Sequence, residues 1–69
     1  MADFIRTTGE VLRGVGERFY EVRTPIGKVV HGFVERKDPH LKPEIGDRVE
    51  LQFKHEDMSR ARITKIVSD

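Results

Sequence analysis

The chain has 69 residues and no cysteine, so we expect one domain, over residues 1–69, whose core is stabilised without disulfides or a cysteine-bound zinc ion. Thirteen Lys and Arg residues against twelve Asp and Glu residues leave a net charge of +1, which excludes a strong overall field for attracting nucleic acid. No apolar run is long enough for a signal peptide or a membrane span, so the sequence predicts a soluble protein without a membrane partner. The absence of cysteine agrees with a reducing cytoplasm, and we expect a monomer.

The first half of the chain contains three short segments typical of β-strands, after a flexible tail expected over residues 1–5. The first strand covers residues 6–13 and ends at Gly14-Val15-Gly16-Glu17, where two glycines permit the positive φ angles of a hairpin turn. The second covers residues 18–24 and is rich in β-branched and aromatic side chains. The turn Thr24-Pro25-Ile26-Gly27 then leads into a third strand over residues 28–34.

The second half begins with a polar segment, residues 35–47, which contains two prolines and is predicted to be a loop with room for one short helical turn. Residues 48–54 follow with the clearest alternation in the chain. Their apolar set, expected to face inward, is Val49, Leu51 and Phe53, and their polar set is Arg48, Glu50, Gln52 and Lys54. A charged turn over residues 55–59 precedes the last strand, residues 60–67, with Ile63 inward and a bulge expected within Lys65-Ile66-Val67.

Five short strands with the longest connection between the third and the fourth predict an all-β fold, a five-stranded oligonucleotide-binding barrel (OB-fold). A five-stranded SH3-like barrel has the same number of strands and stays open as the structural alternative.

The second and third strands are predicted to carry aromatic side chains on their outer face. If Tyr20 and Val22 point into the barrel, the period of two turns Phe19 outward. The same alternation on the third strand places His31 and Phe33 outside, next to Phe19. RNA bases could stack on such rings, on the face that this fold commonly uses for binding. The alternative is that the register is opposite, or that a loop covers the rings, so that both phenylalanines belong to the core.

Two groups of basic residues are candidate phosphate ligands, and RNA held by them would bind more weakly as salt rises. The loop group, interleaved with three acids, is Arg36, Lys37, His40 and Lys42. The group on the last strand is Arg60, Arg62 and Lys65. Arg60 and Arg62 share a face with no acid between them, so this group is the clearer candidate. The other interpretation is that these charges only keep the surface soluble.

Catalytic and metal-binding patterns are missing from the sequence. The three histidines, His31, His40 and His55, have no spacing typical of a zinc site, and no Gly-rich phosphate loop leads from a strand into a helix. A filled barrel of this size also leaves little room for an active-site pocket. We therefore expect a protein that is not an enzyme and that has no metal and no cofactor.

Four motifs occur in the order that a known family shows. They are Gly9-Glu10-Val11-Leu12, Gly27-Lys28-Val29-Val30, Ile45-Gly46-Asp47-Arg48-Val49-Glu50-Leu51 and Asp57-Met58-Ser59-Arg60-Ala61-Arg62-Ile63. Together they resemble the bacterial translation initiation factor 1 family, over residues 8–66. The resemblance implies a protein that binds small-subunit ribosomal RNA near the aminoacyl site during initiation, and it allows other initiation factors as partners.

The resemblance carries RNA binding best onto Arg60 and Arg62, and less closely onto Arg36 and Lys37. Glu21 stands where the family usually has an arginine, Ala61 replaces a glycine, and the basic loop is shorter and contains more acids. A divergent paralogue that acts on another RNA fits the same residues. Two further alternatives are a general single-strand binder or RNA chaperone, and a small barrel that docks a protein partner.

Overall fold

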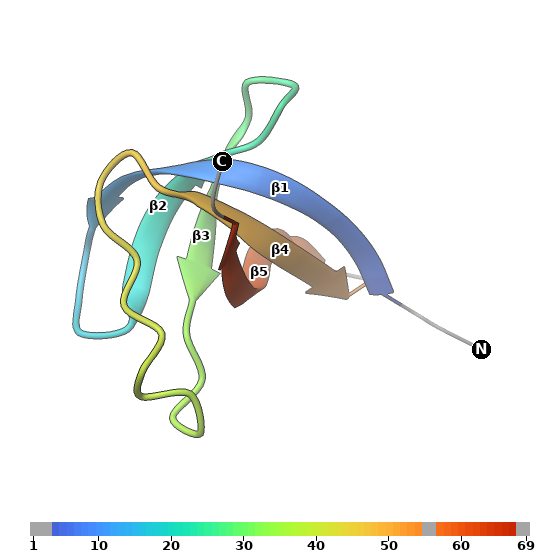
Figure 1. Cartoon of the computed structure of the whole chain (residues 1–69). Helices are drawn as coiled ribbons and strands as arrows, with labels where there is room; N and C mark the ends of the chain where they lie inside the picture. Colours follow the sequence, from blue (N-terminus) through green and yellow to red (C-terminus); the bar gives the residue numbers. More distant parts are fainter. Residues whose placement is uncertain (1–3, 55–56, 68–69) are drawn as a thin grey trace.

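The chain folds into a closed five-stranded barrel in a computed structural model that describes residues 4–54 and 57–67 (Figure 1). The strands are β1 (Phe4–Gly14), β2 (Phe19–Arg23), β3 (Val29–Phe33), β4 (Arg48–Lys54) and β5 (Asp57–Val67). Their order around the barrel is β1-β2-β3-β5-β4, and pairing of β1 with β4 closes the sheet. Neighbouring strands are antiparallel except β3 and β5, which are parallel. This topology confirms the OB-fold and makes the SH3-like alternative wrong.

The strand β1 is long because it pairs with two neighbours. Its first part, from Phe4 to Glu10, lies along β4, and its second part, from Glu10 to Gly14, lies along β2. Phe4 and Ile5, which the sequence placed in a flexible tail, therefore belong to the barrel, while residues 1–3 lie outside the described residues. The last strand also starts earlier than expected, at Asp57, and the predicted turn residues 55 and 56 lie outside the described residues.

Gly9 lies where β1 passes from one partner to the other, and the space around it is too small for a side chain. A Cβ atom there would lie 2.5 Å from Val22 Cγ1 and 3.0 Å from both the Arg23 carbonyl oxygen and Leu51 Cδ1. We expect Gly9→Ala to lower the free energy of unfolding by about 1–3 kcal/mol, because the core must shift to accept the methyl group. Thermal melting followed by circular dichroism measures this loss.

Gly14→Ala is the matched control, because it makes the same change on the same strand. A Cβ atom at Gly14 would meet nothing closer than Tyr20 Cε2, at 3.7 Å, which is an ordinary contact. Gly14→Ala should therefore melt within a few degrees of the unchanged protein. Equal melting points for the two variants would show that the space around Gly9 can accept a side chain.

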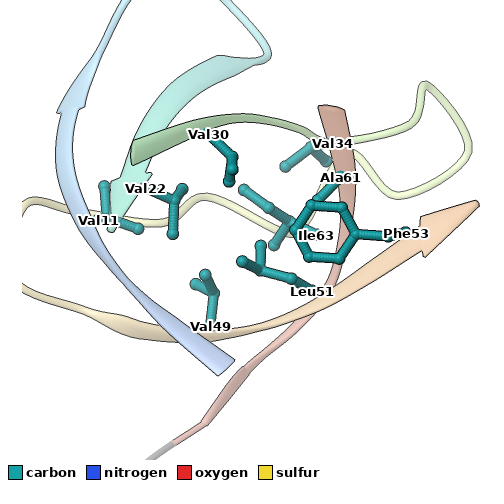
Figure 2. Close-up of a cluster of buried hydrophobic side chains, with 9 residues drawn as sticks. All are labelled: Val11, Val22, Val30, Val34, Val49, Leu51, Phe53, Ala61 and Ile63. Carbon is teal, nitrogen blue, oxygen red and sulfur yellow. The ribbon is translucent and has the colours of Figure 1, made fainter. Parts of the chain in front are cut away.

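Among the described residues, nine buried apolar side chains fill the barrel, and they come from all five strands and the residue after β3. They are Val11, Val22, Val30, Val34, Val49, Leu51, Phe53, Ala61 and Ile63, and they converge on the barrel axis (Figure 2). Tyr20 and Leu41 are partly buried and pack against this cluster. The inward set predicted for residues 48–54 is confirmed, as are the inward positions of Val22, Val30 and Ile63.

Two of the predicted irregularities are present. Gly27 has a φ of 84°, and its N–H donates to the Thr24 carbonyl (2.9 Å), so the turn that joins β2 and β3 is confirmed. In the β4–β5 pair, Glu50 lies opposite Lys65 while Leu51 lies opposite Ile63, which leaves Thr64 as an extra residue. This bulge confirms the predicted break in alternation and begins one residue before the expected segment.

Two other turns differ from expectation. The first hairpin turns at the predicted place, between β1 and β2, but Gly14 and Gly16 do not have the positive φ angles that were expected there. The connection from β1 to β2 is closed by the Val15 N–H, which donates to the Phe19 carbonyl (2.8 Å), and residues 15–18 are enough to reverse the chain without left-handed backbone. The long loop between β3 and β4 forms two successive tight turns, after Glu35 and after Asp38, where a helical turn was allowed. Residues 4–54 and 57–67 contain no helix.

Candidate nucleic-acid interface

Phe19 and Phe33 lie directly opposite each other on β2 and β3, on the outside of the barrel. The Phe19 side chain is 48% exposed, and Phe33 is half-buried. The alternation predicted for these two strands is thus confirmed, and the alternative that both rings belong to the core is wrong. We call these two residues the aromatic pair. Two neighbouring rings on a sheet surface are a suitable platform for stacked bases.

A hollow lies beside the aromatic pair, at the end of β3 where the long loop begins. It is lined by Arg18, Phe19, Phe33, Val34, Glu35, Arg36 and Lys37. Arg36 and Lys37 are exposed, so the first part of the predicted loop group lies next to the rings. Three cations against one acid line this hollow, which favours binding of an anionic group such as a phosphate.

Arg18 was not among the predicted site residues. It lies directly before Phe19, and its carbonyl accepts a hydrogen bond from the Val34 N–H (2.9 Å), which ties the start of β2 to the end of β3. The signal that could have found it is its position next to an outward-facing aromatic residue at a strand end. Sequence reasoning instead counted it as part of the strand.

The two arginines of β5 lie in register with the aromatic face. Arg60 lies opposite His31, and Arg62 lies opposite Phe33. The long loop, however, places two carboxylates against Arg62, with Nε 2.6 Å from Glu35 Oε1 and Nη2 3.9 Å from Asp38 Oδ2. Nε is buried and has no well-aligned hydrogen bond, so the 2.6 Å contact is a charge pair. The sequence has no acid between Arg60 and Arg62, but the two acids that face Arg62 come from the loop after β3.

A row of charged and polar side chains crosses four strands next to the aromatic pair. In register these are Arg13 on β1, Glu21 on β2, His31 on β3 and Arg60 on β5. Arg13 donates from Nε to Glu21 Oε1 (2.9 Å) and from Nη2 to Oε2 (3.2 Å). The hydrogen bond from Arg13 and its charge, with a smaller effect of His31, hold the pKa of Glu21 below its ordinary value against partial desolvation. Glu21 is therefore ionised at neutral pH.

The remaining predicted residues lie farther from the aromatic pair. His40 and Lys42 are exposed on the long loop, and Lys42 lines a second hollow with Arg18 and Tyr20. Lys65 lies opposite Glu50 on β4, beyond the part of β5 that pairs with β3. The predicted residues that the fold brings together are Phe19, His31, Phe33, Arg36, Lys37, Arg60 and Arg62.

Two further findings concern the described ranges, residues 4–54 and 57–67. Within them, no group of three His, Cys, Asp or Glu side chains could hold a metal ion. No helix there is long and apolar enough to cross a membrane.

The chain is similar in structure to a translation initiation factor, factor 1 from the Wolbachia endosymbiont strain TRS of Brugia malayi. The TM-score is 0.77, and the match covers 96% of this chain and 80% of that chain at 18% sequence identity. Neither a protein-family model nor a curated protein matches the sequence. At this level of identity the likeness supports the OB-fold.

Proposed function

We propose that this chain is a translation-initiation-factor-like RNA-binding protein that contacts ribosomal RNA of the small subunit near the aminoacyl site. The observation that carries the proposal is the aromatic pair, two outward-facing rings directly opposite each other across β2 and β3. The structural likeness to an initiation factor and the four sequence motifs support the choice of RNA.

Single-stranded bases would lie flat on Phe19 and Phe33, and each stacked base contributes on the order of 1–3 kcal/mol to binding. Phosphates on one side of these bases would reach the hollow that Arg36 and Lys37 line. On the other side, Arg60 extends the surface across β5. The proposal assigns binding to these residues and no catalytic step.

Co-sedimentation with small ribosomal subunits tests the proposal. The protein should sediment with the subunits, and Phe19→Ala/Phe33→Ala should stay in the supernatant. An excess of random RNA should not release the unchanged protein. Release by random RNA would indicate the general single-strand chaperone, and no sedimentation at all would contradict the ribosomal assignment.

Salt dependence gives a separate prediction for the basic loop. Each phosphate neutralised on a single strand changes the slope of log K against log salt by about 0.7. Lys37→Ala should therefore make the slope shallower by about 0.7, because Lys37 lines the hollow beside the aromatic pair. Fluorescence anisotropy with a labelled RNA oligonucleotide measures the slope.

Lys28→Ala is the control for that measurement. Lys28 is exposed directly before β3, at the opposite end of the strand from Phe33. Its removal takes away one charge from the protein but should leave the slope unchanged. Equal changes for both variants would indicate that RNA senses only the net charge.

A second candidate function is protein docking, which one observation favours. The hairpin between β2 and β3 exposes Ile26, at 86%, and Val29, at 49%, both at the end away from the aromatic pair. If Ile26→Ser prevents binding to the small subunit while Phe19→Ala/Phe33→Ala does not, the contact is to a ribosomal protein. The reverse result supports RNA.

A further inference from the structure

Glu21 is an acidic side chain in the middle of the surface proposed to bind RNA. It is two residues after Phe19 on the same face of β2, and it lies opposite His31. A carboxylate at this position repels phosphate, so it opposes RNA binding unless it contacts a different group of the nucleotide. An ionised carboxylate can only accept hydrogen bonds, so the groups that it could contact favourably are the hydrogen-bond donors of the bases.

The carboxylate of Glu21 is held in place before any ligand arrives. Both of its oxygens accept hydrogen bonds from the Arg13 guanidinium, and the side chain is 28% exposed. A carboxylate offers about four lone-pair sites, so two donors from Arg13 leave acceptor capacity. Arg13 approaches from β1, whereas the aromatic pair lies along β2 and β3. Glu21 is thus a fixed acceptor beside the rings.

A base stacked on the aromatic pair lies within reach of this acceptor. Glu21 follows Phe19 by two residues and is the diagonal neighbour of Phe33 across the strands. Diagonal neighbours on one sheet face are about 7–8 Å apart, which long side chains and aromatic rings can bridge. The width of a base and the length of the glutamate side chain together cover this separation.

We propose that Glu21 selects bases that present an exocyclic amino group, so that cytosine is preferred over uracil on the aromatic pair. Cytosine offers the N4 amino donor at the position where uracil has the O4 acceptor. A carboxylate attracts the N4 amino group of cytosine and repels the O4 oxygen of uracil, while the two pyrimidines stack equally well on the rings. Arg13 is then a positioning residue, which acts through Glu21. The inference rests on the proposed RNA binding, and it adds a base preference.

The test compares the affinities of short single-stranded homopolymers of cytidine and uridine, by fluorescence anisotropy at neutral pH and fixed salt. We expect the unchanged protein to bind the cytidine oligomer roughly fivefold to tenfold more tightly than the uridine oligomer. This ratio is at the low end of the discrimination that a direct hydrogen-bonded contact to a base provides. In Glu21→Gln the ratio should fall to about one, because an amide can accept from N4 and can also donate to O4. The loss should come mainly from tighter binding of the uridine oligomer.

Glu10→Gln is the matched control, since it removes one charge from an acid that is also held by an arginine. Glu10 Oε1 accepts from Arg23 Nη2 (2.7 Å), beside the end of β2 away from Phe19. This variant should strengthen binding of both oligomers equally and keep their ratio. Arg13→Ala should lower the ratio while the carboxylate is still present. Melting by circular dichroism confirms that each variant is folded.

The outcomes separate the two levels of the proposal. If no oligomer binds but the protein still sediments with small subunits, base selection by Glu21 is overturned; if the protein does neither, the proposed RNA-binding function fails. If both homopolymers bind equally well to the unchanged protein, or if Glu21→Gln keeps the cytidine preference, RNA binding stands and base selection by Glu21 is overturned. An equal gain for both oligomers in Glu21→Gln would also overturn it, because charge removal alone explains that result.

Discussion

Phe53→Ala is expected to lower the free energy of unfolding by about 3–5 kcal/mol, since it removes a buried ring and leaves a cavity. The Phe53 side chain is 3% exposed, and the residue lies in register with Ile5 of β1 and Ala61 of β5. The barrel is closed on both sides of this position, so its strands have little freedom to collapse into the space. Urea unfolding at a constant m-value measures the loss.

Phe19→Ala provides the matched control for stability, because it makes the same substitution on an exposed ring of the same barrel. Its side chain is 48% exposed, so about 1 kcal/mol or less should be lost. Similar losses for the two variants would contradict the assignment of Phe53 to the core and Phe19 to the surface. The same measurement shows whether Phe19→Ala remains folded, which the RNA-binding experiment with Phe19→Ala/Phe33→Ala requires.

The parts of the fold that were predicted correctly rest on short-range patterns. In β4, every second residue is apolar, and a period of two assigns the faces without knowledge of the partner strand. The turn at Gly27 depends on four consecutive residues. The aromatic pair follows from the same alternation applied to β2 and β3, once Val22 is taken as inward.

Most of the errors concern contacts between segments that are distant in sequence. Phe4 and Ile5 lie close to the start of the chain, and their place in the sheet depends on pairing with Lys54 and Phe53 of β4. Arg62 has no acid next to it in its own strand, but the loop after β3 brings Glu35 and Asp38 against it. The parallel pairing of β3 with β5, which positions that loop, is not visible in a local pattern.

The charge arrangement shows why a net charge of +1 says little about binding. Arg13, Arg23 and Arg62 are each paired with acids, and these pairs cancel much of the charge across β1, β2 and β5. Arg36 and Lys37 instead line the hollow beside the rings. A locally basic rim next to an aromatic surface can therefore coexist with an almost neutral chain, and the phosphate contacts in it should be few.

In the proposed RNA complex, phosphate contacts are few, so most of the affinity should come from the rings. We expect Phe19→Ala/Phe33→Ala to weaken binding of a single-stranded RNA oligonucleotide by about 2–6 kcal/mol, if each ring stacks one base. This loss corresponds to roughly 30-fold to more than 10,000-fold in the dissociation constant. Fluorescence anisotropy at moderate salt measures it, with circular dichroism to show that the double variant keeps its sheet.

Val29→Ala controls for loss of exposed apolar surface, because Val29 is 49% exposed on β3 but lies opposite Arg23, away from the rings. Its affinity should stay within about threefold of the unchanged protein, since a surface methyl contact contributes a fraction of 1 kcal/mol. Phe19→Tyr/Phe33→Tyr should also bind normally, because the rings remain. If removal of both rings weakens binding no more than Val29→Ala does, phosphate contacts hold the RNA and the aromatic pair is only part of the surface.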